Sequence, residues 1–266
     1  MMFGRIVIFE IKRAFHEINF KLSILIGQLI VLLDLCTFYA KYKNSDSVIL
    51  LQAWIGTDFQ FAYNSLFYIL LPLLACMPYA GSYFTDMQSG YEKNILLKIE
   101  RKKYIVAKMI AVYCSASFCV VVPLLTNLFL LAGLFPDQLP NLLAFNTANI
   151  IDYNIFPALF YTRPVGYCLV FILLAGLFAG VFGMISVAIS KWCRSSFSVI
   201  MFPFVLYIVT DTFFSYQQGN SVAIMEMLNP IQKYIVTYKG LIVNYLVLVI
   251  GSFGVAWGVG RKRNVL

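Results

Sequence analysis

The chain has 266 residues, of which 61% are hydrophobic and 12% are charged, and its formal net charge is +8. Soluble domains are about half apolar and about a quarter charged, so this balance excludes an ordinary soluble protein. The composition places the chain in a membrane, where each backbone polar group within the lipid must be satisfied inside the protein.

Continuous apolar windows occur at six places along the chain, each about long enough to cross the roughly 30 Å hydrocarbon core as a helix. The alternating pattern of a membrane β-barrel does not occur in them. The sequence therefore predicts an all-α integral membrane protein with six transmembrane helices. The expected spans are residues 22–40, 65–84, 109–134, 165–189, 197–214 and 240–260.

The first 21 residues predict an interfacial amphipathic helix rather than a signal peptide, because no compact apolar core follows the first positive charges. Apolar side chains recur on one helical face, and charged or polar ones recur on the other. We expect this helix to lie at the membrane surface and to lead into the first span. The alternative is a plain tail with chance periodicity. The apolar face consists of Phe3, Val7, Ile8, Ile11, Ala14, Phe15 and Ile18.

Two acids, Asp34 and Asp211, lie within the apolar windows. A charged side chain at the bilayer centre costs about 2.5–3.5 kcal/mol on insertion scales, so each is expected to face protein or water rather than lipid. One hypothesis gives them a polar position on a translocation path or a hydrogen bond between spans. The other is that both lie close enough to the membrane surface to be hydrated, and for Asp211 this second interpretation is favoured.

The longest polar stretch, residues 86–108, separates the second span from the third. Ile95, Leu96 and Ile99 share a helical face, and basic residues surround them. A loop that served topology alone would need positive charge but no apolar ridge, whereas a docking helix needs both. We therefore expect a short cytoplasmic helix that docks on a partner.

Two Gly-x-x-x-Gly patterns lie in the second half of the chain, at Gly176/Gly180 in span four and at Gly254/Gly258 in span six. Such spacing lets helix backbones approach closely within a membrane. We expect these glycines to pack helices within the chain, and the alternative is a seam between two chains.

Basic residues are distributed unevenly over the connections between spans, which predicts the orientation. Fifteen of the twenty Lys and Arg fall on the side of the N-terminus, including those of the polar stretch and of the C-terminus. By the positive-inside rule this side is cytoplasmic, so both termini are cytoplasmic. The net charge of +8 then reflects topology and attraction to anionic lipid headgroups rather than nucleic-acid binding. The expected organisation is an interfacial helix (residues 1–21), a six-helix transmembrane domain (22–260) and a basic cytoplasmic tail (261–266).

Catalytic and cofactor motifs are missing from the sequence. His16 is the one histidine of the chain and falls on the interfacial helix, so the spans contain no histidine for a Ser-His site or a Cys/His metal site. The pattern Gly-x-x-x-x-Gly-Lys-Ser/Thr does not occur, so the chain cannot cradle nucleotide phosphates in a P-loop. We expect no catalytic, metal-binding or cofactor-binding residue.

Three stretches carry a resemblance to a known family. "PYAGSYFTDMQSGYEKNILLKIERKKYIVAKMIA" contains the spacing Arg-x-x-Tyr-x-x-x-Lys at Arg101, Tyr104 and Lys108. "FPALFYTRPVGYCLVFILLAGLFAGVFGMISVAIS" leads into and through span four, and the basic N-terminal helix precedes span one. Together they resemble the permease subunits of the ABC-2 class of ATP-binding-cassette transporters, especially small six-span bacterial members of Firmicute type.

The resemblance implies a bacterial cytoplasmic-membrane permease whose N-terminal segment is an elbow helix and whose polar stretch contains a coupling helix. Such permeases hydrolyse no ATP themselves. Two permease chains, identical or paralogous, pair with two cytosolic ATPase subunits that bind ATP and Mg²⁺ and drive export. The coupling residues expected here are Lys93, Ile95, Leu96, Ile99, Arg101, Lys102, Lys103 and Tyr104.

Two other classes of function remain open from the residues alone. An ion-gradient-driven secondary transporter would use several membrane-buried acids and broken helices, and this chain has only Asp34 and Asp211 within its windows. A membrane scaffold or sensor that transports nothing would need no docking ridge. The substrate of an exporter is not encoded in any motif of the sequence.

Overall fold

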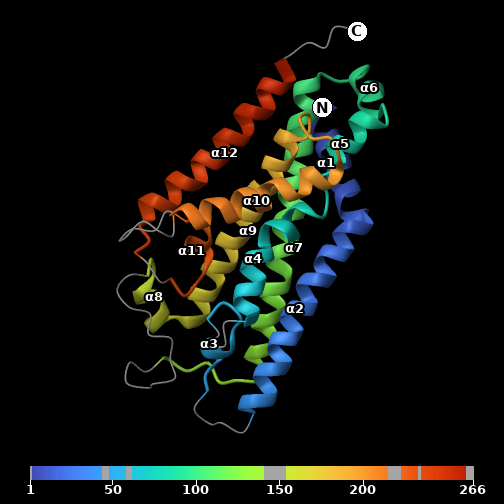
Figure 1. The fold of residues 1–266 in the computed structure, drawn as a ribbon. Helices are drawn as coiled ribbons and strands as arrows, with labels where there is room; N and C mark the ends of the chain where they lie inside the picture. Colours follow the sequence, from blue (N-terminus) through green and yellow to red (C-terminus); the bar gives the residue numbers. More distant parts are fainter. Residues whose placement is uncertain are drawn as a thin grey trace.

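The computed structural model describes residues 2–43, 48–57, 62–140, 154–214, 223–232 and 235–261. Over these ranges the regular elements are α-helices, which form an elongated bundle (Figure 1). In chain order they are α1 (Met2–His16), α2 (Ile18–Tyr42), α3 (Leu50–Ala53), α4 (Ala62–Cys76), α5 (Ser82–Gln88), α6 (Tyr91–Leu96), α7 (Arg101–Ala132), α8 (Pro157–Thr162), α9 (Pro164–Ile189), α10 (Ser196–Phe214), α11 (Ile224–Leu228) and α12 (Tyr238–Arg261).

Five of the described helices are long and apolar enough to cross a membrane: α2, α7, α9, α10 and the Tyr238–Gly258 part of α12. They correspond to the predicted spans one, three, four, five and six. The protein is thus an α-helical, multi-pass membrane protein. The basic tail expected after α12 lies outside the described residues, apart from Arg261 at the end of that helix.

The predicted second span differs from the structure. Instead of one helix over residues 65–84, α4 has 15 residues and ends at Cys76, and turns at residues 77–81 lead into α5. Proline disfavours helical backbone at the residue before it, so Pro78 accounts for the end of α4 near Met77. At about 1.5 Å per residue, α4 alone is shorter than the hydrocarbon core.

The long helices run between two ends of the bundle. Figure 1 shows α1, α5, α6 and the last turn of α12 at one end and α3 and α8 toward the other. We call these the α6 end and the α3 end. Residues 48–57, which form α3 and the turns after it, are buried against the bundle at the α3 end.

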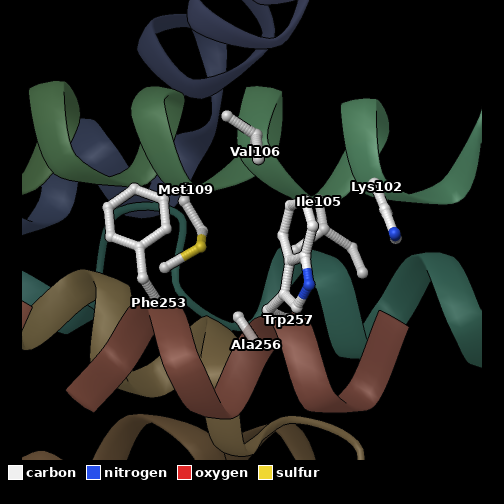
Figure 2. Close-up of a pocket in the computed structure, with 7 residues that line it drawn as sticks. All are labelled: Lys102, Ile105, Val106, Met109, Phe253, Ala256 and Trp257. Carbon is white, nitrogen blue, oxygen red and sulfur yellow. The ribbon is translucent and has the colours of Figure 1, made fainter. Parts of the chain in front are cut away.

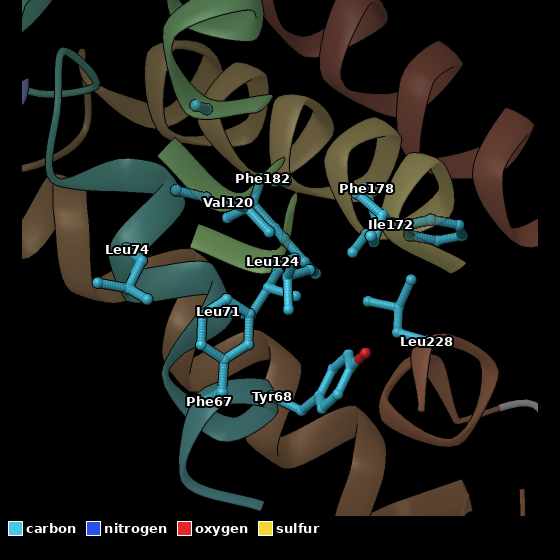
Figure 3. Close-up of a cluster of buried hydrophobic side chains, with 14 of the residues drawn as sticks. Phe67, Tyr68, Leu71, Leu74, Val120, Leu124, Ile172, Phe178, Phe182 and Leu228 are labelled. Atoms are coloured by element: carbon cyan, nitrogen blue, oxygen red, sulfur yellow. The ribbon is translucent and has the colours of Figure 1, made fainter. Parts of the chain in front are cut away.

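The core of the bundle lies around α7 and α9. In the most apolar window of α9, 72% of the residues are buried, against 17% for α10 and 11% for α12, so the last two helices are peripheral. Figure 3 shows the central cluster, to which α4, α7, α9 and α11 contribute Tyr68, Leu124, Phe182 and Leu228, among others. Large apolar side chains on the outer faces of α2, α10 and α12 are exposed, as expected for surfaces that contact lipid chains.

The two glycine patterns occupy different environments. A Cβ atom at Gly176 would lie 2.5 Å from Val121, and one at Gly180 would lie 2.4 Å from the Tyr113 ring, so glycine is needed for α9 to approach α7. At Gly254 and Gly258 of α12 a Cβ atom would meet no described atom within 4 Å. Close packing within the chain is therefore seen at the first pair and not at the second.

Candidate functional site

A buried network of charged side chains joins α1, α5 and α7 at the α6 end. It contains two acids, Glu10 and Asp86, and two bases, Arg13 and Lys108. The Glu10 and Lys108 side chains are fully buried, the Asp86 side chain is 1% exposed, and the Arg13 side chain is 29% exposed. Because buried charges are costly unless they are paired, this cluster is the most constrained polar feature of the described bundle.

Lys108 lies at the centre of the network. Its Nζ donates to Glu10 Oε2 at 2.9 Å, to Asp86 Oδ2 at 2.6 Å and to the Tyr79 hydroxyl at 3.1 Å. An ammonium group has three N–H donors, so all of them are used. The Tyr79 hydroxyl in turn donates to Glu10 Oε2 at 2.7 Å.

Asp86 is bound on both carboxylate oxygens. Arg13 donates to Oδ1 at 2.8 Å and to Oδ2 at 3.1 Å in a bidentate pair, and the Tyr104 hydroxyl donates to Oδ2 at 2.6 Å. Together with Lys108, these groups fill the acceptor sites of the carboxylate. Burial by itself raises the pKa of Asp86, but the Arg13 hydrogen bonds, the Lys108 charge and the Tyr104 hydroxyl lower it below its ordinary value.

The network is electrically balanced, since two carboxylates oppose one ammonium and one guanidinium. Its members come from α1 (Glu10, Arg13), from the segment after α4 (Tyr79, Asp86) and from the first two turns of α7 (Tyr104, Lys108). Such an arrangement ties the N-terminal helix to the start of α7 through the segment after α4. Each charged group of the network is paired with an opposite charge, while the Glu10 Oε1 atom is buried without a hydrogen-bond partner.

A second ion pair holds α6 in place beside this network. Arg101 Nη2 lies 3.2 Å from Glu92 Oε1, and the Tyr83 hydroxyl donates to the same oxygen at 3.2 Å. Burial and the neighbouring Glu92 charge raise the pKa of Tyr83 to about 12. Because these three residues belong to α6, α7 and α5, the turn between α6 and α7 is fixed on both sides.

The predicted coupling residues do not form one helix. Lys93, Ile95 and Leu96 lie on α6, Ile99 lies in the turn that follows, and the remaining four lie in the first turns of α7. Glu100 has extended backbone, with φ −61° and ψ 136°, which separates the two helices. The four predicted coupling residues on α7 are Arg101, Lys102, Lys103 and Tyr104.

The apolar residues of this region face different surroundings. Ile95 packs against the hydrophobic core, whereas its neighbour Leu97 is 86% exposed. An open groove of about 630 Å³ separates the turn between α6 and α7 from the start of α1. The groove is lined by Phe3, Ile6, Leu96, Leu97, Lys98, Ile99, Glu100 and Lys103. An apolar ridge with a charged rim is therefore present, although Leu97 rather than Ile95 projects from it.

Lys102 and Lys103 belong to different surfaces. Lys103 forms an exposed ion pair with Glu100 at 2.9 Å and lines the groove. Lys102 turns toward α12, where its Nζ lies 4.5 Å from the centroid of the Trp257 ring (Figure 2). The Phe253 and Trp257 rings and the aliphatic side chains around this contact leave a cavity of only about 10 Å³ between α7 and α12. Lys103 therefore lies on the surface of the groove, whereas Lys102 lies on the side of α7 that faces α12.

The two acids predicted within the spans lie on separate helices. Asp34 is 1% exposed, on the face of α2 that also buries Val31 and Phe38. Asp211 is half-buried near the end of α10. Asp34 therefore faces protein rather than lipid, as expected of a carboxylate in a span. A role of either acid in transport stays a prediction.

Sequence reasoning missed four members of the buried network: Glu10, Arg13, Tyr79 and Asp86. The amphipathic pattern puts Arg13 on the polar face of the N-terminal helix, but its guanidinium binds Asp86, and the Glu10 side chain is fully buried. The sequence did contain a signal for the network. Glu10 is the one acid in the stretch "RIVIFEIKR", and a buried acid needs a cation as a partner. Lys108, in the Arg-x-x-Tyr-x-x-x-Lys spacing, was a candidate for that cation.

No protein-family model, curated protein or solved structure matches this chain. Among the described residues, no group of three or more His, Cys, Asp and Glu side chains could hold a metal ion.

Proposed function

We propose that this chain is the membrane-spanning permease subunit of an ATP-binding-cassette exporter of the ABC-2 class. In this proposal α4 and the turns after it serve as the second span, and the α6 end is cytoplasmic. Two permease chains form the translocation path in the bacterial cytoplasmic membrane, and two separate cytosolic ATPase subunits supply the energy. The proposal rests on the sequence resemblance together with the geometry of the α6 end.

The observation that carries the proposal is an exposed apolar ridge connected rigidly to a central helix. Leu97 projects into solvent beside the groove, and the Glu92–Arg101 pair fixes the turn that bears it. Two turns further along α7, Lys108 is locked into the buried network. A partner seated on the ridge would therefore push on α7 and, through Glu10, on α1.

This connection supplies what an ATP-driven exporter needs at its cytoplasmic face. Coupling free energy passes between two sites only if the element between them moves as a unit or has two discrete arrangements. The long helix α7 packs closely on α9 through Gly180 and Gly183, so displacement of its first turns would be transmitted along the bundle.

The test is co-purification of the cytosolic ATPase with the paired substitution Leu97→Asp and Ile99→Asp. Placing unpaired charge in a desolvated contact costs several kcal/mol, so the complex should largely dissociate while the chain still inserts. Leu97 is chosen because it is 86% exposed and contributes little to the fold. Ile95 is left intact because it packs against the core.

Trp192→Asp is the matched control, since Trp192 is a 65% exposed apolar side chain on the connection between α9 and α10. It should leave ATPase binding unchanged. Release of the ATPase by Trp192→Asp but not by the paired substitution would move docking to that connection. Export driven by an ion gradient without any ATPase would instead support a secondary transporter, and the permease assignment would then be wrong.

A further inference from the structure

A polar cleft of about 250 Å³ is lined by residues from the junction of α1 and α2, the turns after α4 and the start of α10. It is separate from the docking groove, and its lining residues do not include any of the predicted coupling residues. Its polar side chains include Arg13, Glu17, Ser82 and Ser196, and Met77 and Ile200 supply apolar surface.

The lining of the cleft includes residues at the start of two helices that are long and apolar enough to span a membrane, which indicates a position near the lipid headgroups. Glu17 immediately precedes α2, and Ser196 is the first residue of α10, so both mark the point where a membrane helix begins. Ser82 follows the turns that end α4. Because the candidate spans α2 and α10 begin here and the apolar helix α4 ends nearby, this position suits a ligand that contacts both hydrocarbon and water.

Two side chains of the cleft, Ser82 and Glu17, are available to a ligand. The Ser82 hydroxyl oxygen is buried and has no hydrogen-bond partner. Glu17 is half-buried and forms none of the ion pairs of the described residues. Buried or half-buried polar groups of this kind are normally satisfied, so the cleft is prepared for a polar ligand.

The polar groups of the cleft favour a ligand that carries both a positive and a negative charge. The Glu17 carboxylate favours an ammonium group that can donate hydrogen bonds. Ser82 and Ser196 offer hydroxyl donors, and the start of α10 adds the positive end of the helix dipole, which favours a phosphate. The Arg13 guanidinium, already bound to Asp86, adds positive charge on the same wall.

We propose that this cleft binds the headgroup of an amine-bearing zwitterionic phospholipid, of the phosphatidylethanolamine class, with its ammonium group at Glu17 and its phosphate between Ser82, Ser196 and Arg13. The lipid source is favoured over a free aminoalkyl phosphate because the cleft opens at the headgroup level and Met77 and Ile200 continue it with apolar surface. A bound headgroup bridges the α1–α2 junction to α10. The inference does not depend on the permease assignment.

The experiment compares lipids on the purified full-length chain in detergent, by native mass spectrometry and by thermal unfolding. Phosphatidylethanolamine should bind more tightly and raise the Tm more than phosphatidylcholine, whose quaternary ammonium has no N–H to donate to Glu17. Glu17→Gln should weaken phosphatidylethanolamine binding about tenfold, as expected for loss of a charge-assisted hydrogen bond, and should remove the preference between the two lipids. Ser82→Ala should weaken binding of both.

Matched controls are Glu100→Gln and Ser89→Ala, which change the same residue types on the same end of the bundle but outside the cleft. Both should bind lipid like the unsubstituted chain. Free phosphoethanolamine is the third arm, and saturation by it at the lipid's own concentration would overturn the lipid source. Equal binding of the two lipids by the unsubstituted chain, or an unchanged preference in Glu17→Gln, would overturn the site itself.

Discussion

Replacing Lys108 with Met tests whether the buried network holds the N-terminal helix to the bundle. The substitution keeps most of the side-chain volume but removes three hydrogen bonds and the charge that faces both acids. Asp86 would retain its bidentate Arg13 pair and the Tyr104 hydroxyl. Glu10 would retain only the Tyr79 hydroxyl as a hydrogen-bond donor, so the cost falls mainly on a fully buried carboxylate that no longer has a cation hydrogen-bonded to it.

The expected loss of stability is about 3–5 kcal/mol, the usual cost of removing one partner from a buried ion pair. For chains of this size about 1 kcal/mol corresponds to roughly 2–4 °C, so the Tm should fall by about 10 °C. Thermal unfolding in detergent, followed by intrinsic fluorescence, measures the shift. The additional substitution Glu10→Gln removes the stranded charge and should recover more than half of the loss.

Lys103→Met is the control, because Lys103 lies on the same helix in an exposed ion pair with Glu100. Surface pairs contribute about 0–1 kcal/mol, so the control should shift the Tm by no more than a few degrees. Equal shifts for Lys103→Met and Lys108→Met would refute the inference that the network stabilises the bundle. A double variant, Lys108→Met with Glu10→Gln, that is no more stable than Lys108→Met alone would refute the assignment of the loss to Glu10.

Two further predictions concern pH and helix packing. Because the pKa of Asp86 is lowered in the fold, its pairs stabilise the protein fully above the ordinary carboxyl pKa of about 4 and are lost as the pH falls through the lower folded value. Tm measured against pH should therefore decline below about pH 4, and Asp86→Asn should be less stable at pH 7 but lose less on acidification. Gly180→Ala should lower stability by about 1–3 kcal/mol, because the new methyl group would lie 2.4 Å from the Tyr113 ring, whereas Gly254→Ala should change the Tm little.

The helical membrane architecture could be predicted because hydropathy is a local property of the chain. Five of the expected windows coincide with long apolar helices, and span four, expected at residues 165–189, is α9 (Pro164–Ile189). The second window is not one helix, because a summed hydropathy does not detect the residue at which a helix ends. Pro78 ends the helix in the middle of an apolar run, and the local rule for the residue before a proline was the better guide there.

The buried network could not be read from local pattern, because its members are far apart in sequence. Glu10 and Lys108 are separated by 98 residues and Arg13 and Asp86 by 73. Counting cations for topology treated Arg13 and Lys108 like every other basic residue, although each is neutralised inside the protein. The polar stretch therefore contains two kinds of charged residue that composition does not distinguish. Some face solvent, and others form buried ion pairs.

The two glycine patterns show the same limit in another form. Gly-x-x-x-Gly states only that a backbone can be approached closely, and the partner is decided by which helices are neighbours. At Gly176 and Gly180 that neighbour is α7, whose Val121 and Tyr113 fill the space that side chains would have occupied. At Gly254 and Gly258 the described chain provides no neighbour, because α12 crosses the edge of the bundle and only 11% of its most apolar window is buried. Identical local spacing thus produces a tight contact in one helix and an open face in the other, because α9 lies in the core and α12 lies at the edge of the bundle.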